Sequence, residues 1–285
     1  MIKALILDVD GVLVGAKEGF NFPDPHPEVI MALRRIRNNG TPISLCTAKP
    51  YFAIEKIINE ANLDNIHISE GGAFIFNPKS KYVFRKYLID TQIAIQVIQA
   101  LLEQHIYTEF YDGETYLVQK DRLDQNIFSK HLEVLKREPR IVVSLAEEVF
   151  SSEITKIMPI VPNEGAKAKV EKVLLPFMFS ISLQWSIHPS ALPWQFAIIT
   201  AKGVDKKQGA LDISDGLGIN LENILGCGDS PLDWGFIELC GYGGAMGNAS
   251  LALKNKVLTK GKEKSCIGRD IDENGILDIF NYFQL

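Results

Sequence analysis

The sequence predicts an α/β fold in which a Rossmann-like, parallel-sheet core domain carries an inserted α+β domain. Two observations support this prediction. In both flanking thirds, short apolar runs alternate with helical patterns, which is typical of parallel strands joined by helices. In the middle third, strands follow one another through short turns, which indicates antiparallel pairing. We therefore expect residues 1–78 and 201–285 to form the core and residues 79–200 to form the insert.

The first flank begins with an apolar run that is too short for a helix and rich in branched residues, as in a buried strand. A helix is expected from Pro27, because apolar side chains recur there at helical spacing and Asn38-Asn39-Gly40 supplies a stop signal. The elements expected in order are a strand at 3–7, a helix that begins at about 27 and is stopped by residues 38–40, a strand at 42–46, a helix at 51–61 and a strand at 66–69. This order predicts right-handed crossover units.

The middle third contains strand-like runs and three helical patterns. The expected strands are 82–87, 106–110, 116–118, 154–161, 178–187 and 195–200, and the expected helices are 91–104, 125–137 and 164–175. The turn Tyr111-Asp112-Gly113-Glu114 joins two of these strands as a hairpin. In the last flank we expect a helix at 206–217, a strand at 224–227 and helices at 234–240 and 276–283.

Composition narrows the class of protein. The chain has 285 residues, 46% hydrophobic and 23% charged, with a formal net charge of −5. These values are typical of a globular protein and argue against nucleic acid or an anionic membrane as a partner. The four cysteines show no metal or disulfide spacing, and Cys46 and Cys227 lie in apolar runs where a buried thiol is expected. We find no signal-peptide pattern and no apolar stretch of about 18 residues, so we expect a cytoplasmic protein.

Polar side chains stand where three expected strands of the flanks end. Asp8 and Asp10 follow the first strand, Thr47 follows the second, and Asp229 and Asp233 follow the strand at 224–227. The carboxyl ends of parallel strands meet at one edge of a sheet, so these side chains are expected to converge. Taken alone, Asp8-Val9-Asp10-Gly11 could equally be an Asp-Gly turn with a solvated neighbour.

Convergence of these groups would produce a site for phosphoryl transfer. The carboxylates form an oxygen-only ligand set that suits Mg²⁺. Thr47 offers a hydroxyl donor, and a lysine near position 206 offers a positive charge. A carboxylate nucleophile, a metal, a hydroxyl and an ammonium group are the parts needed to attack a phosphoryl group and neutralise its oxygens.

Four ordered motifs make the chain resemble the haloacid dehalogenase-like superfamily, specifically its Cof-type, sugar-phosphatase-like subgroup with a large C2-type cap. The motifs are Asp8-Val9-Asp10-Gly11, Thr47, Lys202-Gly203-Val204-Asp205-Lys206 and Gly228–Asp233. Two later segments, Ala245-Met246-Gly247-Asn248-Ala249 and Glu273-Asn274-Gly275-Ile276, also look like this subgroup. The spacing to Leu217-Gly218-Ile219 favours Lys206 over its neighbour Lys207 as the motif lysine.

The resemblance implies a role for each motif residue. Asp8 would be the nucleophile and form an aspartyl-phosphate, and Asp10 would be the general acid and then the general base. Asp8, the backbone carbonyl of Asp10 and Asp229 would hold Mg²⁺, with Asp233 in support. Thr47 and Lys206 would bind the transferring phosphoryl group, and Ala48 and Lys49 are weaker candidates. The presence of Asp10 favours phosphate esters over haloalkanoates, because dehalogenation needs no leaving-group proton.

The chain departs from the family's common pattern at several positions. Val12 stands where Thr is common, Thr47-Ala48-Lys49 replaces Thr-Gly-Arg, and Leu232 replaces an Asn. These changes bear on substrate and turnover more than on the class of reaction. The polar residues of the expected cap include Glu109, Asp112, Lys156, Gln184, Trp185 and His188. We expect each of these to be a packing or solvated residue and assign none of them to the site.

The resemblance thus predicts a phosphatase that hydrolyses a small phosphorylated metabolite, such as a sugar phosphate. One alternative is a phosphomutase of the same fold. A second is a catalytically weak phosphometabolite-binding or regulatory protein, which Val12, Ala48 and Leu232 motivate. The oligomeric state is left open by the sequence.

Overall fold

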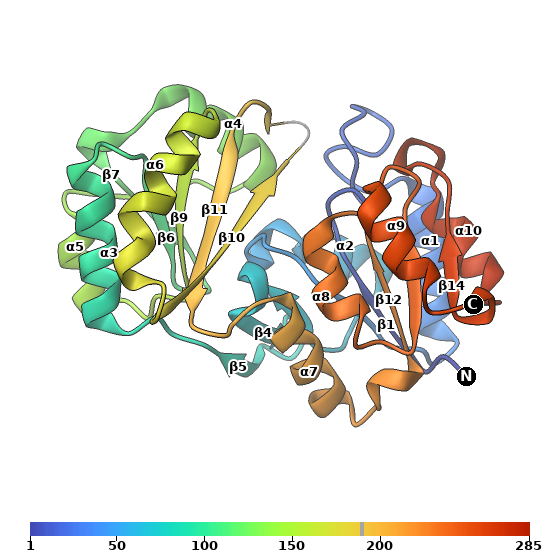
Figure 1. Cartoon of the computed structure of the whole chain (residues 1–285). Helices are drawn as coiled ribbons and strands as arrows, with labels where there is room; N and C mark the ends of the chain where they lie inside the picture. Colours follow the sequence, from blue (N-terminus) through green and yellow to red (C-terminus); the bar gives the residue numbers. More distant parts are fainter. Residues whose placement is uncertain (189–190) are drawn as a thin grey trace. The chain divides into compact units, whose positions relative to one another are not determined.

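The computed structural model describes residues 1–188 and 191–285. It contains two compact units, both drawn in Figure 1. The core unit comprises Met1–Thr47, Ile54–Arg85 and Lys206–Leu285. The insert unit comprises Ala48–Ala53 and Lys86–Asp205. A short segment of the first flank therefore belongs to the insert unit, which the sequence analysis did not anticipate.

The core unit is built on a five-stranded sheet in the order β14-β13-β12-β1-β2. Every neighbouring pair in it is parallel, as predicted. Its strands are β1 (Ala4–Leu7), β2 (Ile43–Leu45), β12 (Ile224–Gly228), β13 (Tyr242–Ala245) and β14 (Ser265–Ile267). β1 lies between β12 and β2, so the residues that follow it are close to the ends of two neighbouring strands.

Helices cover both faces of the core sheet, as the apolar character of β1 requires. Leu5 and Leu7 join one apolar cluster, while Ala4 and Ile6 join the other. The first cluster includes residues of α1 (Pro27–Asn38), α2 (Glu55–Ala61) and α10 (Ile276–Tyr282). The second includes residues of α7 (Lys206–Leu217), α8 (Trp234–Ile237) and α9 (Leu251–Leu258). Cys46 and Cys227 are fully buried, as predicted.

The third predicted strand lies parallel to the β2 segment, as expected, but it is joined there through an isolated bridge and is not a regular strand of the core sheet. β3 (His67–Ser69) instead belongs to a separate three-stranded sheet with β4 (Phe74–Asn77) and β5 (Tyr82–Lys86). β3 pairs with β4 in antiparallel fashion, and only the isolated bridge between Cys46 and Ile68 joins it to the strand β2 segment.

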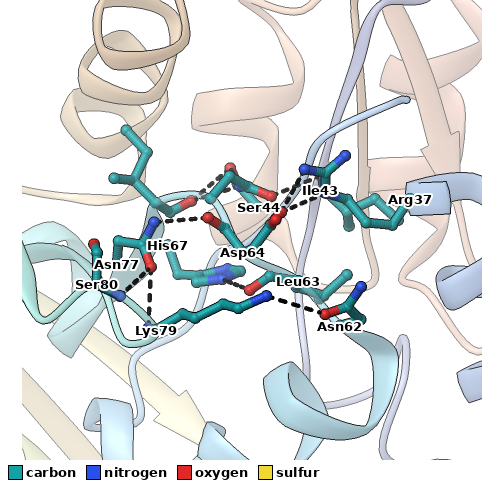
Figure 2. A network of polar contacts seen from close by, with 12 residues as sticks. Arg37, Ile43, Ser44, Asn62, Leu63, Asp64, His67, Asn77, Lys79 and Ser80 are labelled. Carbon is teal, nitrogen blue, oxygen red and sulfur yellow. Dashed lines mark hydrogen bonds and ion pairs between the residues drawn. The ribbon is translucent and has the colours of Figure 1, made fainter. Parts of the chain in front are cut away.

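Side chains explain why β2 and β3 do not form a regular ladder. Their polar atoms bond to backbone groups that would otherwise pair between the two strands. Asn65 Oδ1 accepts a hydrogen bond from the Ile43 N–H at 3.2 Å, and the Ser44 hydroxyl donates to the Ile66 carbonyl at 2.8 Å. Figure 2 shows the network around this junction. Backbone pairing resumes at Thr47, whose N–H donates to the Ile68 carbonyl at 3.0 Å.

His67 is the titratable member of this junction, and it is fully buried. Its Nδ1 accepts from the Leu45 N–H at 3.1 Å, so its proton is on Nε2, which faces the Leu63 carbonyl at 3.3 Å (Figure 2). Burial lowers the pKa of His67 to about 4 from its ordinary 6.5. Protonation of Nδ1 would also remove the acceptor that the Leu45 N–H needs.

We expect His67 to make the core unit less stable in mild acid. In the unfolded chain His67 binds a proton below about pH 6.5, whereas in the folded chain it binds one only below about pH 4. Between these two pH values the proton therefore favours the unfolded chain, and the free energy of unfolding decreases as the pH falls from 6.5 to 4. A shift of this size corresponds to about 3 kcal/mol when the loss is complete. Urea unfolding at pH 7.0, 5.5 and 4.5 should show most of this loss in the wild type and not in His67→Gln. Parallel pH profiles for the two proteins would contradict this expectation.

The insert unit contains a six-stranded sheet in the order β10-β11-β9-β6-β7-β8. Its strands are β6 (Thr108–Tyr111), β7 (Tyr116–Gln119), β8 (Arg140–Val142), β9 (Lys156–Val161), β10 (Ile181–Ile187) and β11 (Gln195–Ala201). The pairs are antiparallel except for β7 with β8. The predicted hairpin between β6 and β7 is present, and Asp112 Oδ1 in its turn accepts from two backbone N–H groups.

The two faces of this sheet carry different apolar clusters. α3 (Thr91–Glu103), α5 (Leu145–Glu148) and α6 (Glu164–Leu174) pack on one face, and Figure 1 shows α3 and α6 side by side there. The opposite face carries an aromatic cluster that includes Tyr107, Tyr111 and Tyr116, with α4 (Gln125–Leu135) and Phe52 packed against it. Trp185 packs against the first of these clusters, as expected for a packing residue, and Trp194 packs against the second.

Short elements account for most differences from the predicted pattern. The sequence analysis missed β4, β8, β13, β14, α5 and α9. The expected helix at 51–61 is divided into a 3₁₀ turn (Tyr51–Ala53) and α2. Apart from α9, which has eight residues, the missed elements have three or four residues and carry too little periodicity to be predicted from a sequence. Within the described residues, no helix has the length and apolar character needed to cross a membrane.

Candidate active site

The core unit brings the main predicted site residues to one edge of its sheet. Asp8 and Asp10 follow β1, Asp229 follows β12, and Lys206 is the first residue of α7. Asp8, Asp229 and Asp233 each offer a carboxylate oxygen within 4.8 Å of the others. Of the side chains expected to converge, the structure brings the carboxylates of Asp8, Asp229 and Asp233 together.

Two glycines allow these chain segments to approach. Gly11 has φ +78°, and a Cβ on it would lie 2.0 Å from Asp229 Oδ2. A Cβ on Gly228 would lie 2.4 Å from the Asp233 Cβ. Any larger residue at either position would displace a carboxylate, so both glycines of the motifs serve the geometry of the site.

Lys206 lies between two carboxylates. Its Nζ is 2.9 Å from Asp8 Oδ1 and 2.7 Å from Asp233 Oδ1, and all three side chains are buried. Burial alone would lower the pKa of Lys206, but the charges of Asp233 and Asp8 outweigh it and raise the pKa well above its usual value. The neighbouring Lys207 is exposed, so the structure favours Lys206 for this position.

Asp233 uses both of its oxygens within the protein. Oδ1 receives Lys206, while Oδ2 accepts from the backbone N–H groups of Asp229 and Ser230 and from the Ser230 hydroxyl. Burial opposes ionisation, but Lys206 and these donors hold the pKa of Asp233 below its usual value. Asp233 thus orients Asp229 and Lys206, which agrees with the supporting position expected for it.

The other two carboxyl groups lack a comparable set of donors. Burial and the nearby charge of Asp233 raise the pKa of Asp8 well above its usual value, although Lys206 acts in the opposite direction. Burial and the charge of Asp233 raise the pKa of Asp229 to about 7. The cluster therefore contains more negative charge than Lys206 balances. An all-oxygen site with excess negative charge fits a divalent cation such as Mg²⁺.

The remaining predicted residues are not members of the three-carboxylate cluster. Asp10 is partly exposed and outside the three-carboxylate cluster, but its charge contributes to the raised pKa of Asp229. Thr47 is buried in the core unit, where its carbonyl accepts from the Gly71 N–H at 3.0 Å. Ala48 and Lys49 belong to the insert unit.

Asn248 is a site residue that the sequence analysis quoted only as part of a motif. Its Nδ2 donates to the Gly11 carbonyl at 2.9 Å and lies 3.4 Å from Asp229 Oδ2. Its Oδ1 accepts from the Ile271 N–H at 3.0 Å. The signal was its place in Met246-Gly247-Asn248-Ala249, directly after β13 and therefore at the same sheet edge.

The structure shows where two of the residues that depart from the family pattern lie. Val12 is fully buried in the apolar cluster below the site, so its side chain packs in the core. Leu232 lies in a 3₁₀ turn (Pro231–Asp233) and is partly exposed.

Comparison with known proteins identifies the family of the chain. A model of the haloacid dehalogenase-like hydrolase family matches residues 5–279, which include all four motifs. The chain belongs to this family. This membership agrees with the resemblance drawn from the motifs.

Several relatives are phosphatases. The chain is 23% identical over 256 residues to 5-amino-6-(5-phospho-D-ribitylamino)uracil phosphatase YitU of Bacillus subtilis, covering 88% of each chain. It is 24% identical over 257 residues to pyridoxal phosphate phosphatase YbhA of Escherichia coli, covering 88% of this chain and 90% of the relative. The structure also resembles that of a subclass IIB sugar phosphatase, with a TM-score of 0.79, 23% identity and 99% of each chain covered. The chain is thus a hydrolase of the phosphatase type.

Proposed function

We propose that this hydrolase is a Mg²⁺-dependent phosphatase that cleaves a small phosphorylated metabolite through an aspartyl-phosphate. The observation that carries the proposal is the buried arrangement of Asp8, Asp229 and Asp233 around Lys206. In this proposal Asp8 supplies a nucleophilic carboxylate, the carboxylate cluster supplies a cation site and Lys206 supplies an ammonium group, which are the parts that phosphoryl transfer requires.

In the proposed reaction, an Asp8 oxygen attacks phosphorus, and the bond between phosphorus and the leaving oxygen breaks. Asp10 donates a proton to that oxygen, and it then accepts a proton from the water that attacks the aspartyl-phosphate. This second step releases inorganic phosphate and restores Asp8. Lys206 has three N–H groups, two of which face Asp8 and Asp233, so the third can bind a phosphoryl oxygen, and Thr47 would bind another.

Asp8, the Asp10 carbonyl and Asp229 would hold the metal, while Asp233 and Asn248 keep Asp229 in position. When bound, Mg²⁺ would neutralise phosphoryl oxygens and keep Asp8 ionised. The same excess of negative charge that raises the pKa of Asp8 and Asp229 supports this assignment.

The division into a core domain and an inserted cap, predicted as 1–78 plus 201–285 and 79–200, remains part of the proposal. We propose that the cap selects the substrate. A phosphorylated sugar or a related metabolite is the substrate class, since the named substrates of two relatives are small phosphate monoesters. A cytoplasmic location, where such metabolites occur, is likewise proposed.

The proposal is tested by hydrolysis of p-nitrophenyl phosphate with and without Mg²⁺. We expect turnover that EDTA abolishes and Mg²⁺ restores, with release of free phosphate, whereas a phosphomutase would return the phosphoryl group to its substrate.

Asp229→Asn should weaken the binding of Mg²⁺ at least about tenfold, as measured by activation curves, because it removes a charged ligand. Wild-type Mg²⁺ affinity should rise from pH 6 to pH 8, because metal-free Asp229 titrates near 7 and must lose its proton on binding.

Asp121→Asn is a matched control, because Asp121 is an exposed aspartate of the insert unit. It should leave the Mg²⁺ dependence unchanged. Hydrolysis that persists in EDTA, or no hydrolysis of any member of a panel of phosphorylated metabolites, would refute the proposed function.

A further inference from the structure

The chain leaves the core unit immediately after Thr47, the residue proposed to bind the phosphoryl group. The Thr47 N–H and carbonyl are bound within the core unit to Ile68 and Gly71. The next residue, Ala48, belongs to the insert unit, as does the rest of the segment Ala48–Ala53. A single peptide bond therefore joins a residue held by the core to one held by the insert.

Lys156 provides the polar attachment of this segment. Its side chain is 1% exposed, and its Nζ donates to the Ala48 carbonyl at 2.9 Å. The same Nζ lies 3.6 Å from the centroid of the Tyr111 ring, an arrangement in which the ring face attracts the cation. Lys156 was one of the polar insert residues that the sequence analysis left unassigned.

A buried network orients Tyr111 beneath this lysine. Tyr111 and Lys156 are direct cross-strand partners on β6 and β9. The Tyr111 hydroxyl donates to Glu109 Oε2 at 2.8 Å, and Glu109 also accepts from Tyr107 and lies 3.0 Å from His131 Nδ1. Glu109 is fully buried, so its negative charge is enclosed on the same side of the sheet as Lys156. The network holds Lys156 in one position.

Phe52 provides a second, apolar attachment. It is 8% exposed and belongs to the aromatic cluster of the insert sheet. The Phe52 ring is stacked with the Tyr116 ring, with 6.2 Å between the two ring centroids. The Arg137 guanidinium lies 4.2 Å from the centroid of the Phe52 ring. The segment is thus attached to the insert unit near both of its ends.

We propose that Lys156 is a positioning residue for the phosphate-binding segment: it fixes Ala48, and through Ala48 the orientation of Thr47. The proposal rests on the proposed function of Thr47 as a phosphoryl ligand. It assigns to the insert unit a part in phosphate binding that is separate from any contact with the rest of the substrate. Lys156 is buried and acts through the backbone, so it is not itself a catalytic residue.

The test measures inorganic phosphate binding by calorimetry in the presence of Mg²⁺, together with p-nitrophenyl phosphate turnover. Lys156→Met keeps most of the apolar stem and removes the donor. We expect this change to weaken the binding of inorganic phosphate about tenfold, because Thr47 would no longer be held in a fixed orientation. In a Thr47→Ala background the same change should cost less than about twofold, because residues that act through one another are not additive. A purely structural loss would lower the active fraction without changing the dissociation constant of the folded molecules.

Lys167→Met is the matched control, because Lys167 is another insert lysine over an aromatic ring, 5.4 Å from that of Trp185, and is not part of the site. It should leave phosphate affinity unchanged. An unchanged phosphate dissociation constant in folded Lys156→Met, or equal effects with and without Thr47, would overturn the positioning role. Failure of the proposed function is distinguished by the wild type, which would then bind phosphate without turning over any phosphate ester.

Discussion

Asp8→Asn should abolish phosphate ester hydrolysis, with kcat reduced at least about a thousandfold, because an amide cannot form the aspartyl-phosphate. The structure predicts that this variant folds. Asp8 Oδ1 accepts from the Val9 N–H at 2.8 Å, and an asparagine oxygen can keep that bond. In metal-free buffer at pH 7 the variant should be at least as stable as the wild type, because the raised pKa of Asp8 shows that its charge disfavours the folded state.

Turnover and urea unfolding of the same preparation check both halves of this prediction. Asp215→Asn is a suitable control, because Asp215 is an exposed core-unit aspartate that pairs with Arg85. It should retain wild-type turnover. An Asp8→Asn variant that hydrolyses p-nitrophenyl phosphate at the wild-type rate would sink the covalent mechanism.

Lys206→Met should lose both activity and stability. It removes the ammonium between Asp8 and Asp233 and leaves two buried carboxylates facing each other. Removing one partner of a buried ion pair costs about 3–5 kcal/mol. We also expect kcat/KM to fall at least about a hundredfold, because a charged group that binds the transferring phosphoryl is lost. Denaturant titration and kinetics with p-nitrophenyl phosphate measure the two effects.

A second substitution separates the two losses. Lys206→Met/Asp233→Asn removes one of the unpaired charges, so it should regain part of the stability while remaining inactive. Mg²⁺ should stabilise Lys206→Met more than the wild type, because the cation then neutralises charges that the lysine no longer balances. A Lys206→Met variant as stable as the wild type in metal-free buffer would contradict the buried ion-pair interpretation.

The sequence predicted the site from the positions of its polar residues along the strands. Asp8, Thr47 and Asp229 each follow an apolar run, and parallel strands place such residues at one edge whatever the details of packing. Asn248 obeys the same rule but was not assigned, because β13 consists of four residues, two of them glycine, and gave no strand signal.

The sequence failed where side chains replace the backbone in pairing. Nothing local distinguishes the strand at 66–69 from a fourth member of the parallel sheet, since the decision depends on Asn65 and His67 reaching donors on β2. The segment after Thr47 is a similar case. Its attachment to the insert depends on Lys156, which lies 108 residues away in the chain.

The sequence by itself determined the class of fold and the family, and it suggested the chemistry that we propose for the site, because strand periodicity and the spacing of motif residues are local properties. The tertiary structure decided how the charges are shared: Asp233 is satisfied by donors and Lys206, while Asp8 and Asp229 are left with excess negative charge. It also decided which unit holds each residue near Thr47. Burial and long-range contacts set these properties, and neither can be deduced from the residues that are adjacent in the sequence.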